Sequence, residues 1–174
     1  MKNNDTVLVN RVANSKLKTI NLENYFPEVE IIEFDIKSFL FQGLILREKE
    51  FRAQMKEIDW EQYRDQTVAI FCSTDAIVPT WAFMLVASYL APYAAQVFMG
   101  NKSEYIESAY RERLAKIDYN QYEDELIVIK GCSNKAVPPS AYVDLTSRLT
   151  PVARSIMYGE ACSTVPIYKK PKKR

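Results

Sequence analysis

The stretch that decides the fold is Thr67-Val68-Ala69-Ile70-Phe71-Cys72-Ser73, and it has a twin in Glu125-Leu126-Ile127-Val128-Ile129-Lys130-Gly131-Cys132-Ser133. Each begins as a short, nearly continuous apolar run rich in β-branched residues, which is typical of a strand buried in a parallel sheet. A polar loop, a proline and a segment with helical spacing follow each Cys-Ser pair. Because proline suits the first turn of a helix, both stretches predict a strand, a loop and a helix in succession.

The two stretches are part of a longer internal similarity. When residues 47–71 are placed above residues 106–130, 8 of the 25 pairs are identical, whereas about 2 would be expected from ordinary residue frequencies. The identical pairs are Glu48/Glu107, Arg52/Arg111, Ile58/Ile117, Asp59/Asp118, Gln62/Gln121, Tyr63/Tyr122, Asp65/Asp124 and Ile70/Ile129. One extra residue, Gly131, then brings Cys72 into line with Cys132. We interpret this pattern as a β-α-β-α unit that is present twice.

Strands that alternate with helices predict the α/β class. We therefore expect a mostly parallel sheet with helices on both faces, built from an internal β-α-β-α duplication. With 174 residues, 48% of them hydrophobic, the chain suits one domain. We place this domain at residues 1–168, with repeat halves at about 29–94 and 95–153 that open on strands at 29–35 and 95–99. We expect a last helix at 150–157 and a basic, disordered tail at 169–174.

Composition excludes several classes of function. The chain has no histidine, which excludes Ser-His-Asp and Cys-His catalysis and imidazole metal sites within it. With only four glycines, it has no glycine-rich phosphate loop. No apolar run is long enough to span a bilayer, and we expect no signal peptide, because residues 1–5 contain no apolar region of the kind that such a peptide needs. We expect a cytoplasmic protein without a membrane partner, and no nucleic-acid partner, because no basic face studded with aromatic residues accompanies the tail.

Each of the three cysteines is followed by serine, in Cys72-Ser73, Cys132-Ser133 and Cys162-Ser163. The first two pairs follow predicted strands, at the edge where open α/β sheets bind ligands. Thiolates suit zinc and iron–sulfur clusters, so our main hypothesis is a metal site built from all three cysteines. Candidate oxygen ligands are Asp75, three residues after Cys72, and Glu160, two before Cys162. A homodimer interface is an alternative source of the missing ligand.

Three other interpretations remain open. A helix N-terminus lowers a thiol pKa, so Cys72 or Cys132 could carry out thiol-based sulfur transfer. The backbone at Ser73, Thr74 and Ser133 could bind an anionic or small-molecule ligand at a helix N-terminus. The cysteines could also be packing residues alone, since cysteine is among the most frequently buried residue types.

Four segments together resemble an uncharacterised bacterial family that is catalogued as a domain of unknown function, family 2480. They are Asn10-Arg11-Val12-Ala13, Gly43-Leu44-Ile45-Leu46-Arg47-Glu48, Cys72-Ser73-Thr74-Asp75-Ala76-Ile77 and Ser155-Ile156-Met157-Tyr158-Gly159-Glu160-Ala161-Cys162-Ser163-Thr164-Val165-Pro166. The resemblance covers almost the whole chain. It implies a single cytoplasmic domain with no established activity, and it favours iron–sulfur assembly proteins as partners.

Overall fold

The computed structural model describes residues 17–131, 134–160 and 163–171. The chain divides into two compact units, one nested inside the other along the sequence. Unit 1 combines the segments Met1–Phe26 and Ala109–Arg174, whereas unit 2 is the continuous segment Pro27–Ser108. Helices alternate with mostly parallel strands, which confirms the predicted α/β class. The expectation of one sheet is wrong, because the strands form two separate sheets.

Unit 2 contains a parallel sheet in the order β2-β3-β4. Its elements are β2 (Ile31–Asp35), the 3-10 helix η2 (Ile36–Phe39), α1 (Glu48–Glu57), the 3-10 helix η3 (Trp60–Tyr63), β3 (Thr67–Phe71), α2 (Thr80–Leu90) and β4 (Gln96–Met99). The apolar run that predicted β3 is the central strand, and its first four residues are buried. Strand β4 pairs with β3 and so completes the sheet of unit 2.

Aromatic side chains fill the core of unit 2. Phe34 of β2 stacks on Trp60 with 5.5 Å between ring centroids, and Trp60 stacks on Tyr89 of α2 at 5.1 Å. Phe51 of α1 and Val86 of α2 are fully buried in the same cluster. Full burial of one such side chain stabilises the fold by about 1.5–3 kcal/mol relative to exposure. Helices α1 and α2 therefore attach to the sheet face that carries Phe34.

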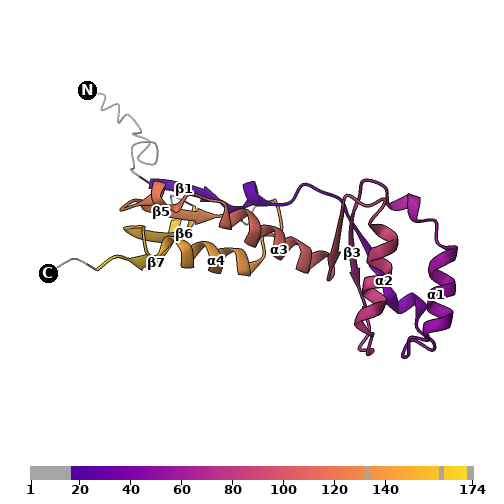
Figure 1. The fold of residues 1–174 in the computed structure, drawn as a ribbon. Coiled ribbons are helices and arrows are strands. Elements are labelled where there is room, and N and C mark those ends of the chain that lie inside the picture. Colours follow the sequence, from indigo (N-terminus) through magenta and orange to yellow (C-terminus); the bar gives the residue numbers. More distant parts are fainter. Residues whose placement is uncertain (1–16, 132–133, 161–162, 172–174) are drawn as a thin grey trace, which may run out of the picture. The chain divides into compact units, whose positions relative to one another are not determined.

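Unit 1 contains a sheet in the order β1-β5-β6-β7, in which β7 alone is antiparallel to its neighbour (Figure 1). Its strands and 3-10 helices are β1 (Leu17–Asn21), η1 (Leu22–Tyr25), η4 (Tyr119–Tyr122), β5 (Leu126–Lys130), β6 (Ser155–Glu160) and β7 (Ser163–Lys169). Helix α4 (Pro139–Leu149) belongs to this unit, and α3 (Lys102–Ala115) begins in unit 2 and ends in unit 1. Leu22, Leu114 and Leu145 are fully buried in the core.

The carboxyl-terminal part of unit 1 differs from the sequence expectation. The helix predicted at 150–157 is wrong, because β6 begins at Ser155 after a turn that contains Pro151. Strand β7 then pairs antiparallel with β6, from Ser155↔Lys169 to Glu160↔Ser163. A bulge interrupts this pairing between Ile156 and Met157. The two strands form a hairpin that the sequence analysis missed.

Several polar contacts occur once in each unit, at positions 59 residues apart. Trp60 Nε1 donates to the Met55 carbonyl at 2.8 Å, and Tyr119 Oη donates to the Leu114 carbonyl at the same distance. Gln62 Nε2 donates to the Asp59 carbonyl at 2.7 Å, and Gln121 Nε2 donates to the Asp118 carbonyl at the same distance. Asp65 and Asp124 both have positive φ, of 58° and 55°. Aspartate tolerates this conformation better than most residues. The turn before β3 and the turn before β5 are therefore built in the same way.

Candidate functional site

The carboxyl edge of the sheet in unit 2 is where the sequence analysis places Cys72. This residue directly follows β3; its thiol is free and half-buried, and its side chain packs against the hydrophobic core. Cys72 lines a cavity of about 390 Å³ together with Thr74, Phe83, Met99 and Glu104, among others. These contacts show that Cys72 has a packing role.

The backbone N–H groups at this edge already have carboxylate partners. Asp35 at the end of β2 accepts hydrogen bonds from the N–H groups of Lys37 and Ser73, at 2.9 and 3.0 Å. At the start of α3, Glu104 accepts from the N–H of Asn101 at 2.7 Å, and Glu33 accepts from that of Lys102 at 2.8 Å. An incoming anion would therefore meet carboxylates of the protein at these N–H groups.

The pKa of Asp35 reflects these contacts. Burial alone would raise it, but hydrogen bonds from Ser73 and from the N–H of Lys37, together with the charge of Lys37, hold it below its ordinary value. Hydrogen bonds to the charged form of a carboxylate favour that form. Asp35 therefore acts as an ionised anchor that ties the loop after β3 to the end of β2.

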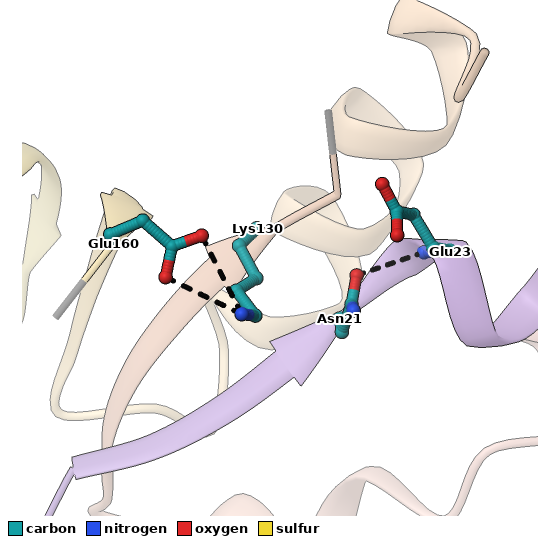
Figure 2. Close-up of polar contacts among 4 residues, drawn as sticks. All are labelled: Asn21, Glu23, Lys130 and Glu160. Carbon is teal, nitrogen blue, oxygen red and sulfur yellow. Dashed lines mark hydrogen bonds and ion pairs between the residues drawn. The ribbon is translucent and has the colours of Figure 1, made fainter. Parts of the chain in front are cut away.

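The carboxyl edge of unit 1 contains a corresponding set of polar residues, four of which Figure 2 shows. Asn21 at the end of β1 accepts a hydrogen bond from the N–H of Glu23, and Glu23 accepts one from the N–H of Asn134. Lys130 at the end of β5 forms an ion pair with Glu160 at the end of β6, at 3.4 Å (Figure 2). Glu160, a predicted metal ligand, is thus paired with a lysine.

The remaining predicted site residues are dispersed or lie outside the description. Ser73 and Asp75 are exposed, and Thr74 is half-buried. Cys132, Ser133 and Cys162 lie outside the described residues. The interval from β3 to β5 and that from α2 to α4 are both 59 residues, whereas Cys72 and Cys132 are 60 apart. Gly131 therefore occupies the position after β5 that Cys72 occupies after β3.

The main hypothesis of a three-thiolate zinc or iron–sulfur site is wrong. Across residues 17–131, 134–160 and 163–171, no group of three or more Cys, Asp or Glu side chains could hold a metal ion. Cys72 is the one cysteine within these ranges, and its neighbours are mainly apolar core residues. The shared Cys-Ser context predicts no ligand geometry by itself, because the cysteines are 60 and 30 residues apart.

The cleft that stands out by its composition lies elsewhere in unit 1, between α4 and the β6–β7 hairpin. It has a volume of about 700 Å³ and is lined by Ile129, Pro139, Tyr142, Val143, Thr146, Ser147, Tyr158 and Ile167. No charged residue is among these lining residues. Tyr142 and Tyr158 meet edge to face, with ring centroids 5.6 Å apart and an interplanar angle of 76°. Such a contact is favourable for aromatic rings and fixes two walls of the cleft.

Local structure explains why the cleft is apolar and open. Ala141, Leu145 and Leu149 of α4 are buried, which turns Val143 outward, where 70% of it is exposed. Ile129 and Tyr158 are register partners on β5 and β6, so their side chains share one face of the sheet. Ile167 lies at the bulge of β7 and is 51% exposed. Large aliphatic side chains are thus held in contact with water around one concavity.

A family model for a protein of unknown function, DUF2480, matches residues 6–170. The chain belongs to the DUF2480 family. This confirms the resemblance inferred from the four sequence segments. No curated protein and no solved structure matches the chain. Within the described part of this DUF2480 chain, no helix has the length and apolar character needed to cross a bilayer.

The cleft of the DUF2480 chain is not evident from the sequence, because Tyr158 and Ile167 in its lining come from the β6–β7 hairpin. A usable signal was present in Ser163-Thr164-Val165-Pro166-Ile167-Tyr168, which is rich in β-branched and aromatic residues. Its proline suits an edge strand, where a missing N–H is tolerated. The position of β7 beside β6, in the order β1-β5-β6-β7, agrees with that rule.

Proposed function

We propose that the DUF2480 chain is a binding protein for an uncharged, apolar organic molecule, which occupies the cleft between α4 and the β6–β7 hairpin. The observation that carries this proposal is a concavity of about 700 Å³ in which none of the described lining residues is charged. Small-molecule sites typically have volumes of about 300–1,000 Å³ and are mostly apolar, with a few polar groups that orient the ligand.

The exposure of the lining residues supplies the driving force for binding. Val143 and Ile167 are 70% and 51% exposed, although both are aliphatic. Covering apolar surface is favourable by about 25 cal/mol for each Å² removed from water. A ligand that covers these two side chains and the ring of Tyr158 would gain this free energy without desolvating a charge.

The polar groups of the cleft favour a particular kind of ligand. Thr146 and Ser147 contribute the aliphatic side-chain hydroxyls of the lining. A hydroxyl can donate or accept one hydrogen bond, which suits a carbonyl, ether or hydroxyl on an otherwise apolar molecule. The edge-to-face rings of Tyr142 and Tyr158 favour a ligand with a planar aromatic part.

The test uses N-phenyl-1-naphthylamine, an uncharged aromatic molecule whose fluorescence rises in apolar surroundings. We expect saturable binding to the full chain and a loss of affinity of about tenfold or more in Val143→Glu, because the variant places a charge in the cleft. The matched control is Met84→Glu on α2, since Met84 is 66% exposed and is not part of this cleft.

Two results would overturn the proposal. One is the absence of saturable fluorescence with the folded wild-type chain. The other is equal affinity in Val143→Glu and the wild type, which would place the probe elsewhere. A filling variant, Ser147→Trp, gives a second check, because a bulky ring in the cleft should also displace the probe. Circular dichroism on each variant establishes that the fold is retained.

We infer further that the two units are copies of one ancestral β-α-β-α unit. The contacts that Trp60 and Tyr119 make, and the positive φ of Asp65 and Asp124, support this inference. The order of β3 and α2 matches that of β5 and α4, and both pairs are separated by the same interval, which supports the inference too.

Several expectations from the sequence stay predictions. They are the halves at 29–94 and 95–153, the domain limit at 168 and the disordered tail. A cytoplasmic location, a homodimer and iron–sulfur assembly partners also stay predictions.

A further inference from the structure

The face of the unit 1 sheet opposite the apolar cleft carries a second, basic pocket of about 470 Å³. It is lined by Leu126, Arg154, Ser155, Met157, Pro166, Tyr168, Lys169 and Lys170. Register places Leu126, Ser155 and Lys169 on that face, since Leu126 pairs with Ser155 and Ser155 pairs with Lys169. Partners in register point to the same face, and neighbours along a strand point to opposite faces. Ile129 and Tyr158 of the apolar cleft therefore lie on the other side.

The charges around this pocket are unbalanced. The two carboxylates that precede Leu126 are already engaged, because Asp124 pairs with Lys170 at 3.8 Å and Glu125 pairs with Lys18 at 3.1 Å. Arg154 and Lys169 are exposed and form no ion pair with any residue that the structure describes. Two cations thus line one concavity, and no described carboxylate forms an ion pair with either of them.

The floor of the pocket is apolar, which restricts the kind of anion that fits. Met157 and Pro166 are register partners, and Leu126 lies on the same face of the sheet. An inorganic anion would leave this apolar floor in water. A ligand that joins an anionic group to an apolar body would use both the cations and the floor.

We propose that this pocket binds the phosphate monoester of an apolar organic molecule. A phosphate monoester carries close to two negative charges at neutral pH, which match the two unpaired cations. The guanidinium of Arg154 has the planar fork of donors that suits phosphate oxygens, and Lys169 adds a point charge. Ser155 contributes a hydroxyl, and the organic group lies over Leu126, Met157 and Pro166. This site is independent of the apolar cleft.

Phenyl phosphate is the probe, and amide chemical shifts of the full chain are the readout. We expect saturable shifts at Ser155, Met157 and Lys169, with tighter binding than for inorganic phosphate or phenol. The double variant Arg154→Ala/Lys169→Ala should weaken binding by about tenfold or more, because it removes two charge-assisted hydrogen bonds. The control, Lys49→Ala/Lys56→Ala on α1, makes the same change in net charge at exposed positions of unit 2.

The alternatives give different results. If the lysines of the edge strand β7 serve only to repel other strands, phenyl phosphate causes no saturable shifts and the proposal fails. If both double variants weaken the binding of phenyl phosphate equally, the effect is one of net charge alone, and the proposal is overturned. If inorganic phosphate binds as tightly as phenyl phosphate, the organic group contributes nothing to binding, and the proposal of a ligand with an apolar body is overturned. Unchanged affinity in Val143→Glu is expected, because that residue lines the other site.

Discussion

Trp60 donates its indole Nε1–H to the backbone carbonyl of Met55 across 2.8 Å and so connects η3 to the end of α1. The last four carbonyls of a helix have no partner within the helix, and Met55 carries one of them. In unit 1, the hydroxyl of Tyr119 makes the same contact with Leu114 near the end of α3. A side chain from the following 3-10 helix therefore satisfies a helix end in each unit.

Trp60→Phe should lower the free energy of unfolding by about 1–3 kcal/mol, because it removes the donor and leaves a void in the stacked aromatic core. Tyr119→Phe removes only a hydroxyl and should cost about 1 kcal/mol. Urea denaturation followed by circular dichroism measures both. Equal costs in the two variants would show that the packing of Trp60 adds nothing to its hydrogen bond.

Gly131 should tolerate no side chain. Its φ is +146°, and a Cβ built there would lie 2.9 Å from Cβ of Leu22, which is fully buried. Gly131→Ala should therefore destabilise unit 1 by more than the strain of about 1–3 kcal/mol that an unusual φ imposes. Gly43→Ala is the control, since Gly43 also has positive φ, +70°, but no atom lies within 4 Å of the built Cβ. Denaturation curves in which both variants lose the same stability would contradict this account.

Asp35 should contribute to stability in a way that depends on pH. Its pKa is lower in the folded state, so its contribution is complete above the unfolded value of about 3.9 and is lost as pH falls through the folded value. Below about pH 4 the free energy of unfolding should therefore fall less steeply in Asp35→Asn than in the wild type. Asp35→Ala should cost about 1 kcal/mol at pH 7, because the cap is lost. Parallel pH profiles for Asp35→Asn and the wild type would contradict the assignment.

Two tyrosines should ionise late. Burial raises the pKa of both Tyr110 and Tyr119 from 10.0 to about 12, and Arg113 and Arg148, respectively, oppose the increase. A folded-state pKa above the unfolded value means that the fold favours the protonated tyrosine. The contribution of each tyrosine to the free energy of unfolding should therefore be constant below about pH 10 and decrease as the pH rises to about 12. Absorbance at 295 nm follows the titration, and each of Tyr110→Phe and Tyr119→Phe should remove one late transition. Loss of an early transition instead would show that the residue is accessible to solvent.

The sequence allowed good prediction of elements whose local pattern is strong. The apolar runs placed β3 and β5, and the segment Pro139–Leu149 is α4 as expected. Pairing between distant segments could not be predicted in the same way. Nothing in Leu17–Asn21 indicates that it becomes a strand beside β5, because the alternation in a strand does not name its partner. The two-sheet arrangement depends on that pairing.

The candidate site was predictable only in part. The edge of a parallel sheet was a sound place to expect polar residues, and Asp35 and Glu160 are found there. The metal site failed because no group of three Cys, Asp or Glu side chains within the described ranges could hold a metal ion, which the spacing of cysteines cannot reveal. The cleft needs the hairpin, the bulge and the outward turn of Val143 together, so no single stretch of sequence contains it.

Because unit 2 lies between the two segments of unit 1 in the sequence, the ribosome synthesises the strands of the unit 1 sheet at widely separated times. Lys18 donates a hydrogen bond from Nζ to the carbonyl of Gln121, 103 positions later in the chain. At about 5–20 residues per second, all of unit 2 is synthesised between β1 and β5. Strand β1 must therefore wait until unit 2 has been synthesised before its own sheet can close, so unit 1 should be the slower half to fold and the one that needs protection in the interval.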